Sequence, residues 1–325
     1  MKINKSHAEK IMNELGKNKI PFLFIIDFDM LEPQVIKLNE VNQSEILFNI
    51  NGKKNYEVKA LPHKEIQFEK YPVPFEIYKE SFGQVLEQIR DGNTYLLNLT
   101  FPTNIKTNLT LREIFLLSNA KYKLFYKNKF VVFSPESFVK IEGNTISSYP
   151  MKGTIDGSIP NAEEIILNDK KETAEHNTIV DLIRNDLSMI ASNVQVEKYR
   201  YVEKIITNNK SLLQVSSKIT GTLGNNYNAK IGEIIFSLLP AGSISGAPKK
   251  KTVEIIKDAE TYSRGFYTGI FGYYDGSVLD SAVMIRFIEK ENDKYFYKSG
   301  GGITFLSDAK LEYLELIDKV YVPIS

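Results

Sequence analysis

The grouping of predicted strands and helices constrains the fold of this chain more than any other feature of its sequence. Apolar segments typical of strands follow one another in groups, and segments with helical periodicity lie between these groups, without strict alternation. Strict alternation would favour a parallel, doubly wound sheet, whereas groups of strands favour antiparallel sheets. The sequence therefore predicts an α+β fold, an α/β sandwich built on large, mostly antiparallel sheets. The predicted strands cover residues 22–26, 94–100, 123–126, 129–133, 138–142, 211–220, 267–274, 281–289 and 295–298.

Helical periodicity and punctuation by glycine and proline define the remaining organisation. Residues 71–74, with the sequence Tyr-Pro-Val-Pro, interrupt the chain and predict a boundary there. We therefore expect a short N-terminal segment, residues 1–75, packed on a domain of residues 76–325 that forms one globular unit. The predicted helices cover residues 76–90, 111–119, 161–190, 231–238, 250–258 and 308–320.

Composition excludes several classes of protein. The 41 Lys and Arg residues balance 40 Asp and Glu residues, so no overall field attracts nucleic acid or an anionic membrane. There is no cysteine, which excludes a thiolate metal site and a cysteine nucleophile. Residues 1–20 are polar and lysine-rich, unlike a signal peptide, and no apolar run approaches the ~20 residues that cross a bilayer. We expect a cytoplasmic enzyme that binds neither nucleic acid nor membrane.

The histidines do not predict a metal site. His7, His63 and His176 show no spacing typical of zinc proteases. A bound metal would therefore be held by carboxylates, which favours Mg²⁺ or a similar hard cation. No glycine-rich phosphate motif follows a strand, and no P-loop lysine is present, so nucleotide binding has no support.

Lys152 is a candidate nucleophile. It stands in the Pro-Met-Lys-Gly-Thr motif of residues 150–154, which we expect to form a rigid turn after a strand. A lysine in such a turn is nucleophilic if burial or a neighbouring cation lowers its pKa. An exposed turn lysine without a chemical role is the alternative interpretation of the motif alone.

Two acidic pairs are candidate metal ligands. Glu172 and Glu175 lie three positions apart on a predicted helix, as do Glu312 and Glu315 on the last predicted helix. Residues with this spacing share a helix face. If the two helices pack side by side, four carboxylates converge on a site suited to Mg²⁺. Each pair alone is equally typical of a solvated helix surface.

Two glycine-containing segments are candidate anion sites. Gly300, Gly301 and Gly302 follow a strand, and Ser243 lies in a Gly-Ser-Ile-Ser-Gly segment before a helix. Glycines allow backbone N–H groups to approach a ligand, and helix N-termini favour anions. We expect these residues to bind a small molecule that carries carboxylates.

Taken in order, these motifs resemble the chorismate-utilising family of anthranilate, aminodeoxychorismate, isochorismate and salicylate synthases. The resemblance runs from about residue 77 to residue 324, and it implies the fold of the anthranilate synthase component I type. Its blocks are Ser-Pro-Glu at 134–136, Pro-Met-Lys-Gly-Thr at 150–154, Ala-Glu-His-Asn-Thr-Ile-Val-Asp-Leu-Ile-Arg-Asn-Asp at 174–186, Gly-Ser-Ile-Ser-Gly-Ala-Pro-Lys at 242–249, Ile-Arg at 285–286, Ser-Gly-Gly-Gly-Ile at 299–303 and Glu-Tyr-Leu-Glu at 312–315.

The resemblance implies a magnesium site between the acidic pairs. Glu175 and Glu315 match the direct ligands, and Glu172 and Glu312 match residues that support the metal through water. The metal would hold the ring carboxylate of chorismate.

The resemblance also implies the residues that bind and protonate the substrate. Arg286 and Tyr267 match the residues that bind the enolpyruvyl carboxylate, together with backbone N–H groups of the glycine triplet at 300–302. Lys319 matches a lysine near the ring carboxylate. Glu136 matches the general acid that protonates the departing 4-hydroxyl, because hydroxide is a poor leaving group.

Lys152 distinguishes among the family members. Anthranilate synthases have alanine in its place, whereas aminodeoxychorismate synthases have a lysine that attacks C2 of chorismate before ammonia attacks C4. Isochorismate and salicylate synthases activate water with a different lysine, at a position that is Leu96 in this chain. The resemblance therefore implies amination of chorismate to 4-amino-4-deoxychorismate, the precursor of p-aminobenzoate in folate biosynthesis.

Two alternatives remain open from the sequence. Anthranilate synthase component I requires that Lys152 be a tolerated variant, and a chorismate-binding scaffold without catalysis has no need of both Glu136 and Lys152. Because the chain lacks the cysteine of a glutaminase, we expect its ammonia to come from a separate glutamine amidotransferase subunit.

Overall fold

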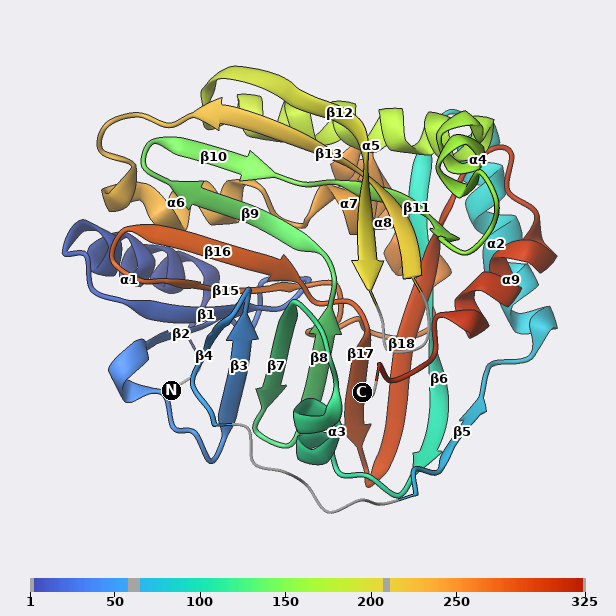
Figure 1. The fold of residues 1–325 in the computed structure, drawn as a ribbon, viewed down its shortest axis with the longest axis horizontal. Helices are drawn as coiled ribbons and strands as arrows, with labels where there is room; N and C mark the ends of the chain where they lie inside the picture. Colours follow the sequence, from blue (N-terminus) through green and yellow to red (C-terminus); the bar gives the residue numbers. More distant parts are fainter. Residues whose placement is uncertain (1–2, 58–64, 207–210, 324–325) are drawn as a thin grey trace.

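Two antiparallel sheets form the framework of the protein (Figure 1). The computed structural model describes residues 3–57, 65–206 and 211–323, and within these residues each sheet has nine strands. In the first sheet β12 (Ser192–Ile206) pairs with β13. The other strands of the first sheet run in the order β11 (Met151–Asp156), β13 (Ser211–Thr222), β10 (Thr145–Ser148), β9 (Ser137–Glu142), β16 (Val278–Val283), β15 (Ile270–Tyr274), β1 (Phe22–Ile26) and β2 (Gln34–Lys37).

The second sheet is built mainly from other parts of the chain. Its strand β5 (Phe68–Tyr71) pairs with β6. The remaining strands run in the order β14 (Gly246–Ala247), β6 (Leu96–Thr107), β18 (Lys294–Ile303), β17 (Phe287–Glu291), β8 (Phe130–Ser134), β7 (Tyr122–Tyr126), β3 (Ile46–Ile50) and β4 (Lys53–Lys54). The predicted α+β class with large antiparallel sheets is therefore confirmed.

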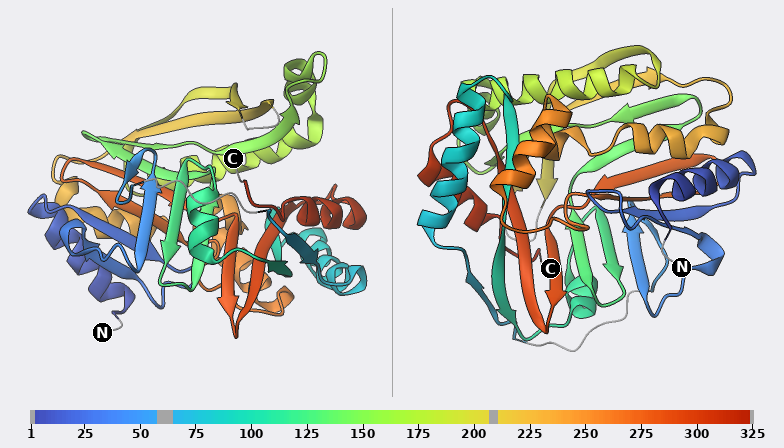
Figure 2. Two further views of the ribbon diagram at one scale, coloured as in Figure 1. Left: turned by 60° about the horizontal axis from the view of Figure 1, so that its bottom comes forward. Right: turned by 180° about the vertical axis from the view of Figure 1, so that it is seen from behind.

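Helices cover the sheets on several sides (Figure 2). Apolar residues of α1, α5, α6 and α7 pack on the first sheet, those of α2, α8 and α9 pack on β6 and β18, and those of α3 pack on the second sheet. A further apolar cluster joins the two sheets directly. The helices are α1 (Lys5–Lys17), α2 (Phe75–Arg90), α3 (Leu111–Leu117), α4 (Ala162–Asn168), α5 (Lys170–Ser188), α6 (Ile231–Ser237), α7 (Gly242–Ser245), α8 (Lys249–Ala259) and α9 (Ala309–Asp318).

None of the helices in the described part of the chain has both the length and the apolar character needed to span a bilayer.

Two neighbouring connections carry the chain from one sheet to the other. Strand β8 of the second sheet leads through residues 135–136 to β9 of the first sheet, and β16 of the first sheet leads through residues 284–286 to β17 of the second. Because β9 pairs with β16 and β8 pairs with β17, the two connections run side by side. Backbone hydrogen bonds join each connection to a strand that flanks the other: Val283 of β16 donates to Glu136 at 3.2 Å, and Phe133 of β8 donates to Arg286 at 3.1 Å.

Two predicted elements are divided in the structure. The predicted helix over 161–190 is two helices, because Asp169 adopts an extended conformation and its side chain accepts a hydrogen bond from the backbone of Glu172, capping α5. The predicted strand over 281–289 is divided into β16 and β17, because the chain leaves one sheet for the other between them. Arg286, with φ of +52°, lies at this point.

The predicted turn at Lys152 is wrong, because Lys152 lies in strand β11. This strand pairs with β13, and its register shifts between Met151 and Thr154, where Gly153 has a φ of +82°. Such an irregularity is a β-bulge, which changes the direction of the side chains beside it. The apolar alternation that predicts a strand is lost at the bulge, which explains why the motif resembles a turn.

The division of the chain at residue 75 stays a prediction. Strands from residues 22–54 take part in both sheets: β1 pairs with β15, and β3 pairs with β7.

A buried ion pair connects the second sheet to the segment before β15. The side chains of Arg264 and Glu260 are each 2% exposed, and their closest N···O distance is 2.7 Å. Glu260 also accepts hydrogen bonds from the backbone and the hydroxyl of Thr100, and Arg264 donates to the carbonyl oxygens of Ile244 and Asn98. These contacts connect β6, α7 and α8, so the loss of either charge would leave the other buried without its partner.

We expect Glu260→Gln to lower the free energy of unfolding by about 3 kcal/mol, because Arg264 would remain charged in an apolar environment. Asp181→Asn is the control, since Asp181 pairs with Arg184 on the surface, where the loss should stay within about 0.5 kcal/mol. Urea unfolding measures both. Equal losses in the two variants would contradict the role of the buried pair.

Candidate active site

Glu136 and Arg286 lie on the two neighbouring connections between the sheets. Glu136 lies immediately before β9, and Arg286 lies immediately before β17. Tyr267, which precedes β15, is 3% exposed, and its hydroxyl lies near both residues: the charge of Arg286 lowers the pKa of Tyr267 and that of Glu136 raises it. The net pKa of Tyr267 is raised, chiefly by burial, so its hydroxyl is a neutral donor.

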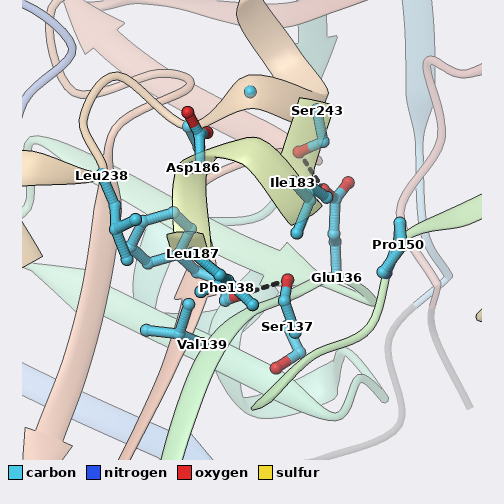
Figure 3. Close-up of a pocket in the computed structure, with 13 residues that line it drawn as sticks. Glu136, Ser137, Phe138, Val139, Pro150, Ile183, Asp186, Leu187, Leu238 and Ser243 are labelled. Carbon is cyan, nitrogen blue, oxygen red and sulfur yellow. Dashed lines mark hydrogen bonds between the residues drawn. The ribbon is translucent and has the colours of Figure 1, made fainter. Parts of the chain in front are cut away.

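Glu136 is held by Ser243. The Ser243 hydroxyl donates a hydrogen bond to Oε1 of Glu136, and the two side chains point toward each other in the lining of a cavity of about 20 Å³ (Figure 3). A cavity of this size holds a single water-sized molecule. The lining is mostly apolar, with Phe138, Ile183 and Leu187 among its residues. Ser243, expected to bind substrate, contacts the candidate acid in this structure.

Burial raises the pKa of Glu136 above its ordinary value, although the Ser243 hydrogen bond and the charge of Lys152 act in the opposite direction. A raised pKa favours the protonated form of a carboxyl group, which is the form that can donate a proton to a leaving group. The environment of Glu136 therefore suits the general acid that the sequence predicts.

Lys152 forms an ion pair with Glu175. Its Nζ donates to Oε2 of Glu175 at 2.9 Å, and the side chains are 22% and 7% exposed. Burial alone would lower the pKa of Lys152, but the carboxylates of Glu175, Glu172 and Glu315 more than offset this effect, and the net pKa is raised. In this arrangement Lys152 is an ammonium ion, so it becomes a nucleophile only when that pairing weakens.

The glycine triplet lies against these charged groups. A Cβ atom built on Gly302 would be 3.1 Å from Nζ of Lys152 and 3.6 Å from Oε2 of Glu175. A Cβ atom on Gly301 would be 3.4 Å from Oε2 of Glu312. The absence of side chains here therefore lets the acidic pairs and Lys152 approach the strand closely.

One edge of this strand is open toward the site. Strand β18 pairs with β6 from Tyr295 to Ile303, but the described pairing with β17 stops at Lys298, because β17 begins opposite it at Phe287. The glycines at 300–302 thus lie beyond the end of β17. This geometry is compatible with the predicted use of their backbone N–H groups, which stays a prediction.

Leu96 also lies at this strand. Its Cδ1 would be 3.1 Å from a Cβ atom on Gly302, on the side where Lys152 lies. An apolar residue therefore occupies the position at which the resemblance implies a water-activating lysine in isochorismate and salicylate synthases.

Helix α9 supplies the second acidic pair and a second lysine. Glu312 is 3% exposed and accepts a hydrogen bond from Ser307 at 2.7 Å. Lys319 pairs with Glu315 at 2.7 Å and donates to the carbonyl oxygen of Gly300 at 2.8 Å. Burial lowers the pKa of Lys319, and the carboxylate of Glu315 opposes this effect.

The predicted convergence of four carboxylates is only partly seen. Residues from both acidic pairs lie near Lys152, whose pKa responds to Glu172, Glu175 and Glu315. Across residues 3–57, 65–206 and 211–323, however, no three or more Asp, Glu, His or Cys side chains are arranged to hold a metal ion. Lysine ammonium groups contact one carboxylate of each pair instead.

Arg286 differs in its pairing from Arg264, which is buried. Arg264 is paired with Glu260, whereas no carboxylate of the described residues forms an ion pair with Arg286. The guanidinium of Arg286 is partly buried and lies under the ring of Tyr321, 5.2 Å from its centroid. A partly buried cation without an anionic partner is suited to an anionic ligand, and a guanidinium matches a carboxylate in a bidentate manner.

Two polar contacts near the site were not predicted. His176 is 1% exposed, and its Nε2 lies 2.7 Å from the hydroxyl of Ser217. Lys249 binds Asp186 at 2.7 Å, which ties the start of α8 to the end of α5. Both lie in the sequence blocks that carry the family resemblance, but their roles depend on partners 41 and 63 residues away. Of the other histidines, His7 is exposed on α1, and His63 lies outside the described residues.

The sequence matches a family of known proteins over most of its length. The model of the family described as chorismate binding enzyme matches residues 29–325. A Haemophilus influenzae protein named "Uncharacterized PabA-like protein" is 51% identical over 318 residues, which cover 98% of this chain and 97% of that protein.

Two further relatives have more specific names. The aminodeoxychorismate synthase component 1 of Bacillus subtilis is 28% identical over 311 residues, which cover 88% of this chain and 62% of that protein. The crystal structure of anthranilate synthase component I from Streptococcus pneumoniae has a TM-score of 0.64 and 27% identity, and covers 79% of this chain and 59% of that one. The predicted fold of the chorismate-utilising type is thereby confirmed.

We expect the stability of the protein to depend on His176 between pH 6.5 and 4. Burial, with the charges of Arg200 and Lys152, lowers the pKa of His176 from 6.5 to about 4. Below pH 6.5 the unfolded chain binds a proton that the folded chain excludes, so this histidine destabilises the fold by roughly 3 kcal/mol once the pH has fallen to 4.

Urea unfolding at several pH values tests this expectation. His176→Gln should remove most of the loss between pH 6.5 and 4, and His7→Gln, at an exposed position, should leave it intact. An unchanged pH dependence in His176→Gln would contradict the assignment.

Proposed function

This chain belongs to the chorismate binding enzyme family, and we propose that it aminates chorismate to 4-amino-4-deoxychorismate, the step that leads to p-aminobenzoate. The main support for this proposal is the position of Lys152. It lies near Glu136 and the glycine triplet, where a nucleophile would face the substrate ring. The likeness to the aminodeoxychorismate synthase component 1 of Bacillus subtilis supports it.

The proposed reaction has two displacements. When its pairing with Glu175 opens, the ammonium of Lys152 gives a proton to water and becomes a neutral amine. This amine forms a bond to C2 as the double bond shifts and the 4-hydroxyl leaves, and Glu136 gives that hydroxyl a proton so that water departs. Ammonia then forms a bond to C4, the double bond returns, and the bond between C2 and Lys152 breaks. One proton from the ammonia nitrogen restores Glu136. Chorismate and ammonia thus give the amino product and water.

Arg286 and Tyr267 would hold a carboxylate of chorismate during both displacements. Arg286 has no carboxylate partner among the described residues, and Tyr267 offers a neutral hydroxyl beside it. Two such contacts fix the ring relative to Lys152, which favours attack at one carbon.

Magnesium would fit this site by ligand type. Glu172, Glu175, Glu312 and Glu315 offer the carboxylate oxygens that Mg²⁺ prefers, and the glycine triplet leaves space beside two of them. When bound, Mg²⁺ would supply positive charge for a substrate carboxylate. Since Lys152 and Lys319 pair with two of these carboxylates, binding of the metal would require those ion pairs to open.

The ammonia would come from a glutamine amidotransferase subunit, because a chain without cysteine lacks the thiol of such a glutaminase. The name "PabA-like" of the relative from Haemophilus influenzae is compatible with a protein of this pathway. The second candidate activity is anthranilate synthesis, favoured by the structural likeness to anthranilate synthase component I of Streptococcus pneumoniae.

The product identifies the activity. Incubated with chorismate, Mg²⁺ and ammonium near pH 8.5, the protein should form a product that an added lyase converts to p-aminobenzoate. Lys152→Ala should lower this rate by roughly 100-fold or more, because no covalent adduct can form. Mass spectrometry of the product and of the intact protein measures both. Fluorescent anthranilate from the wild-type protein would overturn the proposal in favour of the second activity.

We also expect the ammonium group of Lys152 to weaken the binding of Mg²⁺. We expect Lys152→Met to bind Mg²⁺ at least about tenfold more tightly, because the ammonium no longer competes for Glu175, a carboxylate that is buried. Isothermal titration measures this affinity without turnover. Lys218→Met, which removes a lysine paired with Glu197 away from the site, is the control. Equal affinities in the wild type and Lys152→Met would contradict the expectation.

A further inference from the structure

Arg286 carries a charge that the fold does not neutralise with a carboxylate. Its side chain can adopt many rotamers, and no described ion pair restricts it. Its backbone has a φ of +52°, a conformation that is rare for residues other than glycine and that is maintained by the connection between the sheets. The backbone of Arg286 is thus fixed, and its guanidinium requires another contact to be held in one orientation.

The ring of Tyr321 provides that contact. It lies over the guanidinium, with Cζ of Arg286 5.2 Å from the ring centroid. This distance lies within the range in which an aromatic ring attracts a cation. The hydroxyl of Tyr321 also forms a hydrogen bond with the guanidinium, so both the ring and the hydroxyl of this residue contact Arg286.

The segment after α9 is anchored on both sides of Tyr321. Val320 is 2% exposed and belongs to the apolar cluster beneath α3, and the carbonyl oxygen of Pro323 accepts a hydrogen bond from the backbone of Asn119 at 2.8 Å. Tyr321 itself is 45% exposed, so the burial of its ring in the core does not explain its position. The same segment begins with Lys319, which contacts Gly300.

We infer that Tyr321 is a positioning residue for substrate binding: its ring and its hydroxyl hold the Arg286 guanidinium for a substrate carboxylate, and the ring covers that guanidinium from water. Exclusion of water from one face strengthens the attraction between Arg286 and the carboxylate. The C-terminal segment therefore completes the subsite that the connection between the sheets begins. The inference rests on the proposed function in that chorismate is the carboxylate used to test it.

Three variants separate this role from a general effect on the fold. Tyr321→Phe keeps the ring, Tyr321→Leu removes it, and Tyr71→Leu is a matched control. Tyr71 is 47% exposed and lies under Lys106 at 5.1 Å, so it resembles Tyr321 in exposure and in its cation contact but lies on β5.

Steady-state kinetics with chorismate give the first test. Tyr321→Leu should raise KM for chorismate roughly 3- to 30-fold and change kcat by less than about twofold, the effect expected from the loss of one cation–ring contact. Tyr321→Phe, which keeps the ring and loses the hydroxyl, should raise KM by a smaller factor than Tyr321→Leu, and Tyr71→Leu should stay within about twofold of the wild type in both constants. An unchanged KM in Tyr321→Leu would overturn the inference, as would a loss in Tyr321→Phe equal to that in Tyr321→Leu.

A double-mutant comparison tests the connection to Arg286. In an Arg286→Lys background, Tyr321→Leu should raise KM for chorismate by a smaller factor than in the wild type, because the planar group that the ring holds is already absent. The same factor in both backgrounds would assign the effect of Tyr321 to another contact and overturn the inference.

Chemical labelling tests the same point without substrate. Phenylglyoxal should modify Arg286 severalfold faster in Tyr321→Leu than in the wild type or Tyr321→Phe, as followed by mass spectrometry of the peptide that contains it. Equal rates in all three proteins would overturn the inference. Formation of anthranilate would overturn the proposed function alone, since both the labelling and KM for chorismate are independent of the product.

Discussion

The pairing of two antiparallel strands as they pass from one sheet to the other is the constraint on which the rest of this structure depends. The two chain segments stay paired on both sides of the passage between the sheets, because β8 and β17 pair in one sheet and β9 and β16 pair in the other. The two residues at the passage, Glu136 and Arg286, have backbones bonded to the strands that flank the opposite connection. Main-chain bonds, which do not depend on the side chains themselves, therefore fix the positions of an acidic and a basic residue on neighbouring connections.

Around this location the charges are arranged unevenly. Lys152 and Lys319 each pair with a carboxylate, and burial raises the pKa of Glu136, whereas Arg286 has no carboxylate partner among the described residues and lies against the side chain of Tyr321. An uncompensated positive charge is costly in a partly buried place unless a ligand provides the opposite charge. The site is thus suited to a molecule that brings its own carboxylates, and its lysines can respond to any cation that competes for theirs.

Sequence patterns predict much of this fold, and the exceptions have identifiable causes. Strand β1 and helix α2 are predicted within one residue of their observed limits, because each is a local pattern of apolar residues. The break at Asp169 depends on one side chain that caps α5, and the bulge at Lys152 depends on pairing with β13, about 60 residues later. The residue types of the site are recognisable from motifs, but the contacts of Ser243 with Glu136 and of Tyr321 with Arg286 join segments 107 and 35 positions apart. Local sequence patterns do not show which residues so far apart in the sequence will be in contact.

The strand order has a consequence for the way in which the protein is made. Strand β18, near the end of the chain, lies between β6 and β17, so β6 has no neighbour on that side until residues 294–303 have left the ribosome. At typical rates of synthesis, β6 waits roughly 10–40 s with an unpaired edge. During that time the nascent chain exposes backbone groups that can pair with other chains. The second sheet is therefore completed by an inner strand, and only near the end of translation. The step that removes the unpaired edge of β6 is the synthesis of β18, the last long strand of the chain.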